Sequence, residues 1–401
     1  MRRKILLVTP FAPTAGGRHG GARVVHGLVG ELVERHDVVL LHLDGEDIDP
    51  AVGDRCLAVH SVVPSDPGRW GVRARGAAAV LRGRSLKAAA SAVPELRRRV
   101  VELTRAFSPD VVQVESGVLG DALADARGAG RVVTLYETAA SVHETLPLRG
   151  HALPLALRMD ARAALQEERR ILGRADGVVV FTERDRRLVA PALRPGAELV
   201  TIPLGWDVPA TACDPVGAAP PTLLFAANFQ HLPNVHAALT LGRRILPLVR
   251  RQHPDVRLDI VGSSPPPDVL RLAGGTIEVT GAVPSVTPYL ERAAVVVVPI
   301  ALGGGMRVKV LEALAAGKAV VASTRAAEGL TARAGEDLVV VDGDADTAAA
   351  VGRLVADAEA RRQLGENARA WALRELSWAA MADAYDELYA RLACRVRRRR
   401  S

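Results

Sequence analysis

One stretch, residues 303–321, limits the fold of this chain more than any other. It reads GGGMRVKVLEALAAGKAVV and predicts a loop, a helix and a strand in direct succession. The apolar residues of its middle part recur at the spacing of a helix with one buried face: Val308, Leu311, Leu314 and Ala315. Gly317 predicts the end of that helix, and the short apolar run that follows, residues 319–322, predicts a strand.

The same stretch predicts a phosphate site. Glycines let the backbone approach a ligand closely, and a loop that enters a helix offers free N–H groups at the positive end of the helix dipole. Arg307 and Lys309 add two cations there. Glu312 lies roughly 10 Å further along the helix axis, at about 1.5 Å per residue, which is the reach from a diphosphate to a ribose. The plainer interpretation is a turn followed by a solvated glutamate, because the motif is neither a Walker loop nor a GxGxxG fingerprint.

Length and composition point to a two-domain globular protein. The chain has 401 residues, of which 49% are hydrophobic and 24% charged, and each half is long enough for a core of its own. Its three cysteines are distant in sequence and odd in number: Cys56, Cys213 and Cys394. That arrangement disfavours a disulfide framework or a zinc site and predicts a reducing compartment.

Charge and hydropathy bear on whether the chain enters a membrane or binds nucleic acid. The apolar run at residues 5–8 is too short for a signal peptide and predicts a buried strand, and no run has the ~20 apolar residues of a membrane span. The net charge is +7, but five arginines lie within residues 395–401, so the rest carries only +2. We therefore expect a cytoplasmic protein that does not bind nucleic acid. The basic tail is a candidate for peripheral contact with anionic lipid on the inner face of a membrane.

The amino-terminal half has the order of a doubly wound α/β domain. Residues 4–9 predict a strand, residues 10–21 a Gly- and Pro-rich loop, and the following residues a helix and a second strand at 38–42. Further strands are predicted at 110–115, 132–137, 177–182 and 199–203, with helices within 69–107 and at 162–172 and 183–193. Tyr136, Glu137, His143 and Glu144 follow the end of one predicted strand, where ligands bind in such sheets, although a lone His or Glu at such a place is more often structural.

The second half repeats this plan after a Pro-rich boundary at residues 208–221. Strands are predicted at 222–227, 256–262, 277–280, 293–299 and 339–342, and a helix at 235–250. A last helix carries one apolar stripe: Trp378, Met381, Tyr385, Leu388 and Leu392. We expect an amino-terminal domain at 1–208, a second at 209–376, a helix at 377–394 and a disordered basic tail at 395–401.

With these residues in view, nearly the whole chain resembles the family 4 retaining glycosyltransferases of the GT-B fold. The strongest matches lie in the second half: 225–228 with Pro233-Asn234, 261–262, 279–283, 303–321, 327–330 and 376–378. In the first half they are 20–23 and 167–182. The resemblance implies two facing Rossmann-like domains and a last helix that crosses back to the first domain. It also implies carbohydrate biosynthesis by sugar transfer from a nucleotide-sugar donor, with retained configuration and without a metal or other cofactor.

The resemblance also assigns roles to residues. The donor, a UDP-, GDP- or dTDP-sugar, would bind the second domain and the acceptor the first. Glu312 matches the glutamate that holds the ribose, and Gly20 and Gly21 match a first-domain loop that closes on the donor phosphates. The remaining donor-binding matches comprise the diphosphate loop, the segment beside the base and the first strand's end: Gly303, Gly304, Gly305, Met306, Arg307, Lys309, Gly281, Ala282, Val283 and Asn228.

Three departures from the family pattern alter the expected site. Gly304 stands where many members have a second glutamate, so sugar recognition must differ. Residues 228–234 lack the usual Lys, which leaves Arg307 and Lys309 to neutralise the diphosphate and stabilise the leaving group. Many members have a cleft histidine where this chain has Tyr136-Glu137, so Glu137 and His143 are both catalytic candidates.

Several alternatives stay open at this point. They are an epimerase or sugar phosphorylase of the same fold, an inactive sugar-nucleotide-binding scaffold, and a basic protein that binds membrane or nucleic acid through its tail. Two pairs of acids have metal-like spacing, Asp47/Asp49 and Asp342/Asp344, but they lie in polar loops and we expect no metal there. The acceptor, whether glycan, lipid-linked or small molecule, and the oligomeric state are open.

Overall fold

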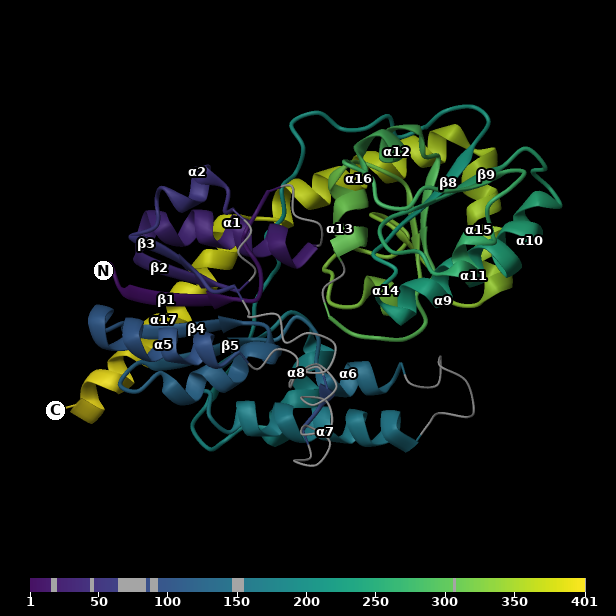
Figure 1. Ribbon diagram of the computed structural model, residues 1–401. Helices are drawn as coiled ribbons and strands as arrows, with labels where there is room; N and C mark the ends of the chain where they lie inside the picture. The colour runs from purple at the N-terminus through teal and green to yellow at the C-terminus, as the bar shows by residue number, and fades with distance from the viewer. Residues whose placement is uncertain are drawn as a thin grey trace. The chain divides into compact units, whose positions relative to one another are not determined.

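The structure is a computed structural model that describes residues 1–15, 20–43, 47–63, 84–86, 93–145, 155–305 and 308–400. The chain forms two compact units (Figure 1). The first comprises Met1–Gly205, Gly304–Met306 and Trp378–Ser401, and the second Trp206–Gly303 and Arg307–Ser377. The change of unit after Gly205 lies three residues before the expected domain boundary at 208.

The described part of the first unit contains a parallel sheet of seven strands, in the order β3-β2-β1-β4-β5-β6-β7. The strands are β1 Lys4–Thr9, β2 Asp37–His42, β3 Ala58–Ser61, β4 Val111–Glu115, β5 Gly130–Thr134, β6 Gly177–Val180 and β7 Glu198–Thr201. The sequence predicted all of these except the short β3, whose side chains are only half-buried. Because the order reverses between β1 and β4, their loops diverge there and leave room for a ligand.

Helices cover both faces of this sheet, as expected for parallel strands. They are α1 Gly20–Arg35, α2 Pro50–Gly53, α5 Pro94–Phe107, η1 Gly117–Asp125, α6 Ala139–His143, α7 Leu155–Leu172, α8 Glu183–Val189, η3 Ala190–Ala192 and α17 Trp378–Arg400. In the region 69–107, predicted to be helical, α5 is a helix, whereas residues 69–83 and 87–92 lie outside the described residues.

The second unit repeats the topology. Six parallel strands are ordered β10-β9-β8-β11-β12-β13 among its described residues, with the reversal between β8 and β11. The strands are β8 Thr222–Ala226, β9 Arg257–Val261, β10 Ile277–Val279, β11 Val295–Val298, β12 Val320–Ala322 and β13 Val339–Val340. The helices are α9 Leu232–Thr240, η4 Leu241–Ile245, α10 Leu246–Arg250, α11 Pro267–Leu270, α12 Thr287–Arg292, α13 Val308–Ala315, α14 Thr324–Ala327, α15 Asp344–Ala356 and α16 Ala358–Glu375. The predicted helix at 235–250 is interrupted by the π-helical turn η4.

The last helix, α17, packs on the first unit through the predicted apolar stripe. Met381, Tyr385 and Leu388 are completely buried, and Leu392 is 1% exposed. A methyl group on Gly130, at the start of β5, would lie 3.0 Å from Leu392. The helix therefore packs closely on the strand because no side chain intervenes, and α17 belongs to the core of this unit.

The basic tail differs from the expected disorder, because α17 continues to Arg400. Arg391 and Arg395 both pair with Glu198, at 2.5 and 2.9 Å, and Arg395 also donates to the carbonyl of Gly196. Arg397 lies 3.9 Å from Asp110. Pairing with acids of the first unit thus offsets part of the repulsion among the arginines. Within the described ranges, no helix is long and apolar enough to cross a membrane.

Trp378, at the start of α17, fills the space left by two glycines. A methyl group on Gly27 of α1 would lie 2.4 Å from the indole ring, and one on Gly205 only 2.2 Å from it. Both distances are far below van der Waals contact, so the ring occupies the volume that a side chain would need.

We predict that Gly27→Ala destabilises the protein by roughly 1–3 kcal/mol, the usual cost of overpacking a core. Gly30→Ala in the same helix is the matched control, because nothing lies within 4 Å of its added methyl group. That control gains up to about 1 kcal/mol from helix propensity. Urea unfolding of both variants measures the difference, and equal stabilities would show that Trp378 does not limit the space at Gly27.

Candidate active site

Four adjacent loops form the candidate donor site in the second unit. They follow the carboxyl ends of β10, β9, β8 and β11, which are neighbours in the sheet. Each carries residues that the sequence singled out, namely 281–283, 262, 228 and 303. The parallel sheet therefore brings these separate motifs to one edge, at the point where the strand order reverses.

The loop after β8 is a tight turn built by asparagines. The Asn228 side chain accepts a hydrogen bond from the N–H of Gln230 at 2.9 Å, and the Asn228 carbonyl accepts one from the side chain of Asn234 at 2.6 Å. The turn passes close to the loop after β9, where a methyl group on Gly262 would lie 1.8 Å from the carbonyl oxygen of Ala227. Asn228 thus shapes this edge, and Gly262 allows the two loops to meet.

The segment predicted to lie beside the base is tied to the same edge. The N–H of Gly262 donates to the carbonyl of Gly281 at 3.0 Å, and Gly281 has a φ of +72°, which favours glycine. Ala282 is exposed and Val283 half-buried. The backbone at 281–283 is therefore fixed in a turn whose side chains remain accessible.

Helix α13 has the amphipathic form that the sequence predicted. Its buried side is wholly apolar, comprising Val310, Leu311, Ala313, Leu314 and Ala315. Lys309 and Glu312, three residues apart, are only half-buried and share one side of the helix. The predicted stop at Gly317 is confirmed: its φ is +77°, its N–H bonds to the carbonyl of Leu314, and the next N–H bonds to that of Ala313. Met306 and Arg307 lie outside the described residues.

Neighbouring polar groups have structural partners. The Ser323 hydroxyl donates to the carbonyl of Ile300 at 2.5 Å, which fixes the start of the loop after β11. Asp342 bonds to the N–H and hydroxyl of Thr324, and Asp344 pairs with Arg244 at 2.5 Å. In the part of the chain that the structure describes, no group of three or more His, Cys, Asp and Glu residues could hold a metal ion.

In the first unit, the corresponding edge begins with the loop between β1 and α1. Gly20 and Gly21 form the first turn of α1 and are half-buried. They lie beside the reversal of strand order between β1 and β4, while residues 16–19 lie outside the described ranges. The structure therefore places the predicted glycine pair at the ligand-binding edge of this sheet.

A buried polar cluster follows β5 and β6 at the same edge. The Ser141 hydroxyl donates to Asp185 at 3.0 Å and accepts from Thr138 at 2.8 Å and from Arg184 at 2.9 Å. Arg184 also pairs with Glu144. Sequence reasoning missed this cluster, although Thr138 and Thr182 each cap a helix that begins with the next residue. In particular, Thr182 and Asp185 have the Ser/Thr-x-x-acid spacing that marks a helix start.

The glycine loop belongs partly to the first unit, which includes Gly304–Met306. A methyl group on Gly304 would lie 2.2 Å from the Ser141 hydroxyl, and one on Gly305 would lie 2.2 Å from the Tyr136 carbonyl. The Cβ of Glu137 lies 3.4 Å from that same Gly305 position, whereas His143 is exposed at the end of α6. Glu137 is therefore the candidate that lies beside the glycine loop, and side chains at 304 and 305 would not fit.

Glu168 on α7 is hydrogen-bonded to the start of α6, next to this cluster. Its carboxylate accepts a hydrogen bond from the N–H of Ala139, the first residue of α6, at 2.6 Å. The pKa of Glu168 is raised to about 7, mainly by burial, which the hydrogen bond from the Ala139 N–H partly offsets and to which nearby Asp185 adds. This carboxyl group therefore changes charge near neutral pH and holds the start of α6.

A second buried network links α17 to the strands beneath this edge. Glu115, 1% exposed, accepts hydrogen bonds from Thr134 at 3.0 Å and from Tyr136 and Gln113. Burial raises the pKa of Glu115, and these three donors partly offset the rise. Thr134 also lies 3.1 Å from the hydroxyl of Tyr385 on α17. The last helix thus helps to fix Tyr136, which leads into Glu137.

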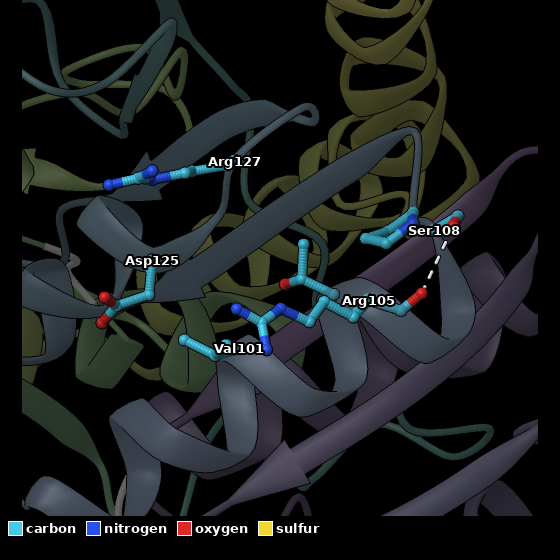
Figure 2. A pocket seen from close by; sticks show the side chains of 7 residues that line it. Val101, Arg105, Ser108, Asp125 and Arg127 are labelled. Carbon is cyan, nitrogen blue, oxygen red and sulfur yellow. Dashed lines mark hydrogen bonds between the residues drawn. The ribbon is translucent and has the colours of Figure 1, made fainter.

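A cavity of about 420 Å³ lies at the opposite, amino-terminal edge of the first sheet. Figure 2 shows Arg105, Asp125 and Arg127 around it, with the Ser108 hydroxyl bonded to the carbonyl of Arg105. Ser108 lies three residues before β4, and Arg127 lies three residues before β5. Because ligands of parallel sheets bind at the carboxyl edge, we do not assign the candidate site to this cavity.

Comparison with known proteins agrees with this geometry. Residues 19–205 match the family described as "Glycosyl transferase 4-like domain", and residues 220–357 match "Glycosyl transferases group 1". A GDP-mannose-dependent alpha-(1-6)-phosphatidylinositol monomannoside mannosyltransferase of Mycolicibacterium smegmatis is 30% identical over 278 residues. The match covers 64% of this chain and 69% of that relative.

Solved structures with the same fold cover nearly the whole chain. Sucrose-phosphate synthase from Thermosynechococcus elongatus has a TM-score of 0.70 at 18% identity, over 97% of this chain and 99% of its own. The Anabaena protein HepE, in complex with UDP-glucose, has a TM-score of 0.64 at 13% identity, over 96% and 100%. At such identities the likeness shows the fold, which is the predicted GT-B arrangement of two Rossmann-like domains.

We predict a pH dependence of stability that arises from Glu168. Its pKa is about 7 in the folded protein against an ordinary 4.5, so the folded state binds the proton more tightly. The resulting stabilisation is complete below about pH 4.5 and is lost as the pH rises through 7, with an upper value of roughly 3 kcal/mol. Glu168→Gln removes this component of the pH dependence, whereas Glu366→Gln, at an exposed carboxylate, keeps it. Urea unfolding between pH 4.5 and 8 measures both, and identical profiles for the two variants contradict the assignment.

Proposed function

Because the chain belongs to the family 4 glycosyltransferases, we propose that it transfers a hexose from a nucleoside-diphosphate donor with retention of configuration and without a metal ion. The observation that carries the donor site is the meeting of four motif-bearing loops at the strand reversal of the second sheet. A phosphate-binding loop, a following helix and a carboxylate one turn further along are the parts that such a donor needs.

In this proposal, Glu312 accepts the ribose hydroxyls of the donor. The backbone N–H groups of residues 303–307, together with Arg307 and Lys309, hold the diphosphate. Residues 281–283 line the base, Asn228 shapes the turn beside it, and Gly20 and Gly21 are candidates for binding the donor phosphates. The domain limits stay as proposed from the sequence, with donor binding at 209–376 and acceptor binding at 1–208.

The chemistry depends on stabilising the leaving group. The bond between the anomeric carbon and the diphosphate oxygen breaks, and a bond from that carbon to an acceptor hydroxyl oxygen forms. Negative charge grows on the departing nucleoside diphosphate, so preorganised N–H groups and cations lower the barrier. Glu137, beside Gly305, is the candidate that contacts the donor sugar, and His143 is the second candidate.

The relatives guide the choice of substrates. The mycolicibacterial relative uses GDP-mannose and a phosphatidylinositol mannoside, whereas HepE was solved with UDP-glucose. We propose GDP-mannose as the first donor to test and a lipid-linked glycan as the first acceptor class, because the relative with the higher identity uses them. An epimerase, a sugar phosphorylase and an inactive scaffold are less favoured, since the matched families are transferases.

We predict that Glu312→Ala weakens binding of the cognate nucleotide by about 1–3 kcal/mol, the cost of losing a charged hydrogen bond. Calorimetric titration with GDP, UDP, dTDP and ADP identifies the base and measures the loss. Glu366→Ala is the control, because this exposed glutamate lies on α16, away from the four loops. If Glu312→Ala binds the nucleotide as tightly as the wild type, the ribose role of Glu312 is wrong.

We further predict that the product of an α-linked donor is an α-glycoside and that EDTA leaves the rate unchanged. Proton NMR of the anomeric signal follows the configuration from the first turnovers, before any equilibration. A β-glycoside product excludes retention, and activity that disappears with EDTA and returns with added Mg²⁺ excludes a metal-independent reaction.

A further inference from the structure

The outer face of helix α7 combines exposed apolar side chains with arginines. Its exposed side chains recur every three or four residues and therefore lie on one side of the helix: Leu155, Arg158, Met159, Arg162, Gln166, Arg169 and Arg170. Leu155 is 73% exposed and Met159 is 49% exposed. This set, called the α7 face below, combines two large apolar side chains with four arginines and contains no acid.

The acids of α7 all have partners in the protein. Asp160 accepts a hydrogen bond from the N–H of Leu86 at 2.6 Å, and Glu168 accepts one from that of Ala139. Glu167 pairs with Arg84 at 2.5 Å and with Arg170 at 3.2 Å. In contrast, Arg158, Arg162 and Arg169 have no ion-pair partner among the residues that the structure describes. The helix thus uses its negative charges internally and leaves a positive surface outside.

Two further apolar side chains are exposed on segments that pack against other sides of α7. Leu86, 43% exposed, is held beside α7 through Asp160, and Val142, 40% exposed, lies on α6, which packs against α7. Figure 1 shows α6 and α7 side by side. On the α7 face itself, the exposed apolar side chains are Leu155 and Met159, both at the amino-terminal end of the helix.

The other basic residues that the sequence offered have acidic partners at 97–99 and, in part, in the tail. Arg97 pairs with Asp125 at 2.7 Å, Arg98 with Glu95 and Arg99 with Glu102. In the basic tail, Arg395 pairs with Glu198. The α7 face differs from these residues because it places two exposed apolar side chains beside arginines that lack an ion-pair partner among the described residues.

We propose that the α7 face docks on an anionic lipid bilayer and lies in its interface. An interfacial helix needs exposed apolar side chains that enter the acyl boundary and cations that meet the headgroups, and this face supplies both. Such docking brings the carboxyl edge of the first sheet, where the acceptor is proposed to bind, close to the membrane. The link to a lipid-linked acceptor rests on the proposed function, whereas the docking itself does not.

The test measures sedimentation of the full chain with vesicles of phosphatidylcholine alone or mixed equally with phosphatidylglycerol. We expect binding to the anionic vesicles only, weakening as salt is added. Arg158→Gln with Arg162→Gln lowers the partition coefficient about 25-fold, at about fivefold for each cation removed from the surface. Leu155→Gln with Met159→Gln also lowers it strongly, because the inserted apolar area is lost. The matched control, Arg243→Gln with Arg374→Gln, has the same change in charge on exposed residues of the second unit and keeps wild-type binding.

Four outcomes overturn the proposal. They are no binding of the wild type to anionic vesicles, equal binding to neutral vesicles, α7 variants that bind like the control, and loss of binding only when residues 395–401 are removed. A dimer in sedimentation velocity that Leu155→Gln with Met159→Gln dissociates assigns the face to a second copy and also overturns it. Nucleotide titration of the α7 variants separates this proposal from the catalytic one, since both variants should bind the nucleotide normally.

Discussion

The direction of the strands is the constraint on which the rest of this structure depends. In each sheet all described strands run parallel, so the loops at their carboxyl ends gather at one edge. The strand order then reverses once, between β1 and β4 in the first sheet and between β8 and β11 in the second. Two loops that lead away in opposite directions leave a space at each reversal. The glycine pair at 20–21 and the glycine loop at 303–305 both occur beside such a reversal.

Some glycines at these carboxyl edges are needed because a Cβ at their positions would overlap with neighbouring atoms. Gly262 lets the loops after β8 and β9 meet. At Gly304 and Gly305, the neighbouring Ser141 and Tyr136 leave no room for a Cβ. The same principle holds in the core, where Gly27 and Gly205 provide the volume that Trp378 occupies. A substitution at any of these positions acts by steric overlap, so its effect depends on the neighbour rather than on backbone propensity alone.

Ion pairs decide which of the basic residues form a positive surface. Acids that would weaken a positive surface are used inside the protein, as Asp160, Glu167 and Glu168 are on α7. The arginines at 97–99 and part of those in the tail are paired with nearby acids. By sequence, the excess of arginines lies in the tail. In the described structure, the largest set of arginines on one helix face without ion-pair partners lies on α7.

The sequence by itself determined the fold class, most strands and the donor-side motif. Short apolar runs specify buried parallel strands, and the spacing in residues 308–315 specifies one buried face of α13, because both patterns are local. The end of that helix at Gly317 followed from the need for a positive φ. The sequence did not predict α15, α16 or the helical state of residues 395–400, which depends in part on ion pairs with Glu198 and Asp110.

Only the tertiary structure decided which polar residues meet. Ser141 and Asp185 are 44 residues apart and come together because β5 and β6 are neighbours. Glu115 and Tyr385 share Thr134 as a hydrogen-bond partner, although Thr134 and Tyr385 are 251 residues apart. Periodicity reports which side of an element is buried, but it contains no information about which distant element covers that side. The pKa of Glu168, the close fit of Trp378 and the exposed α7 face all follow from such long-range contacts, and for that reason only the folded chain could reveal them.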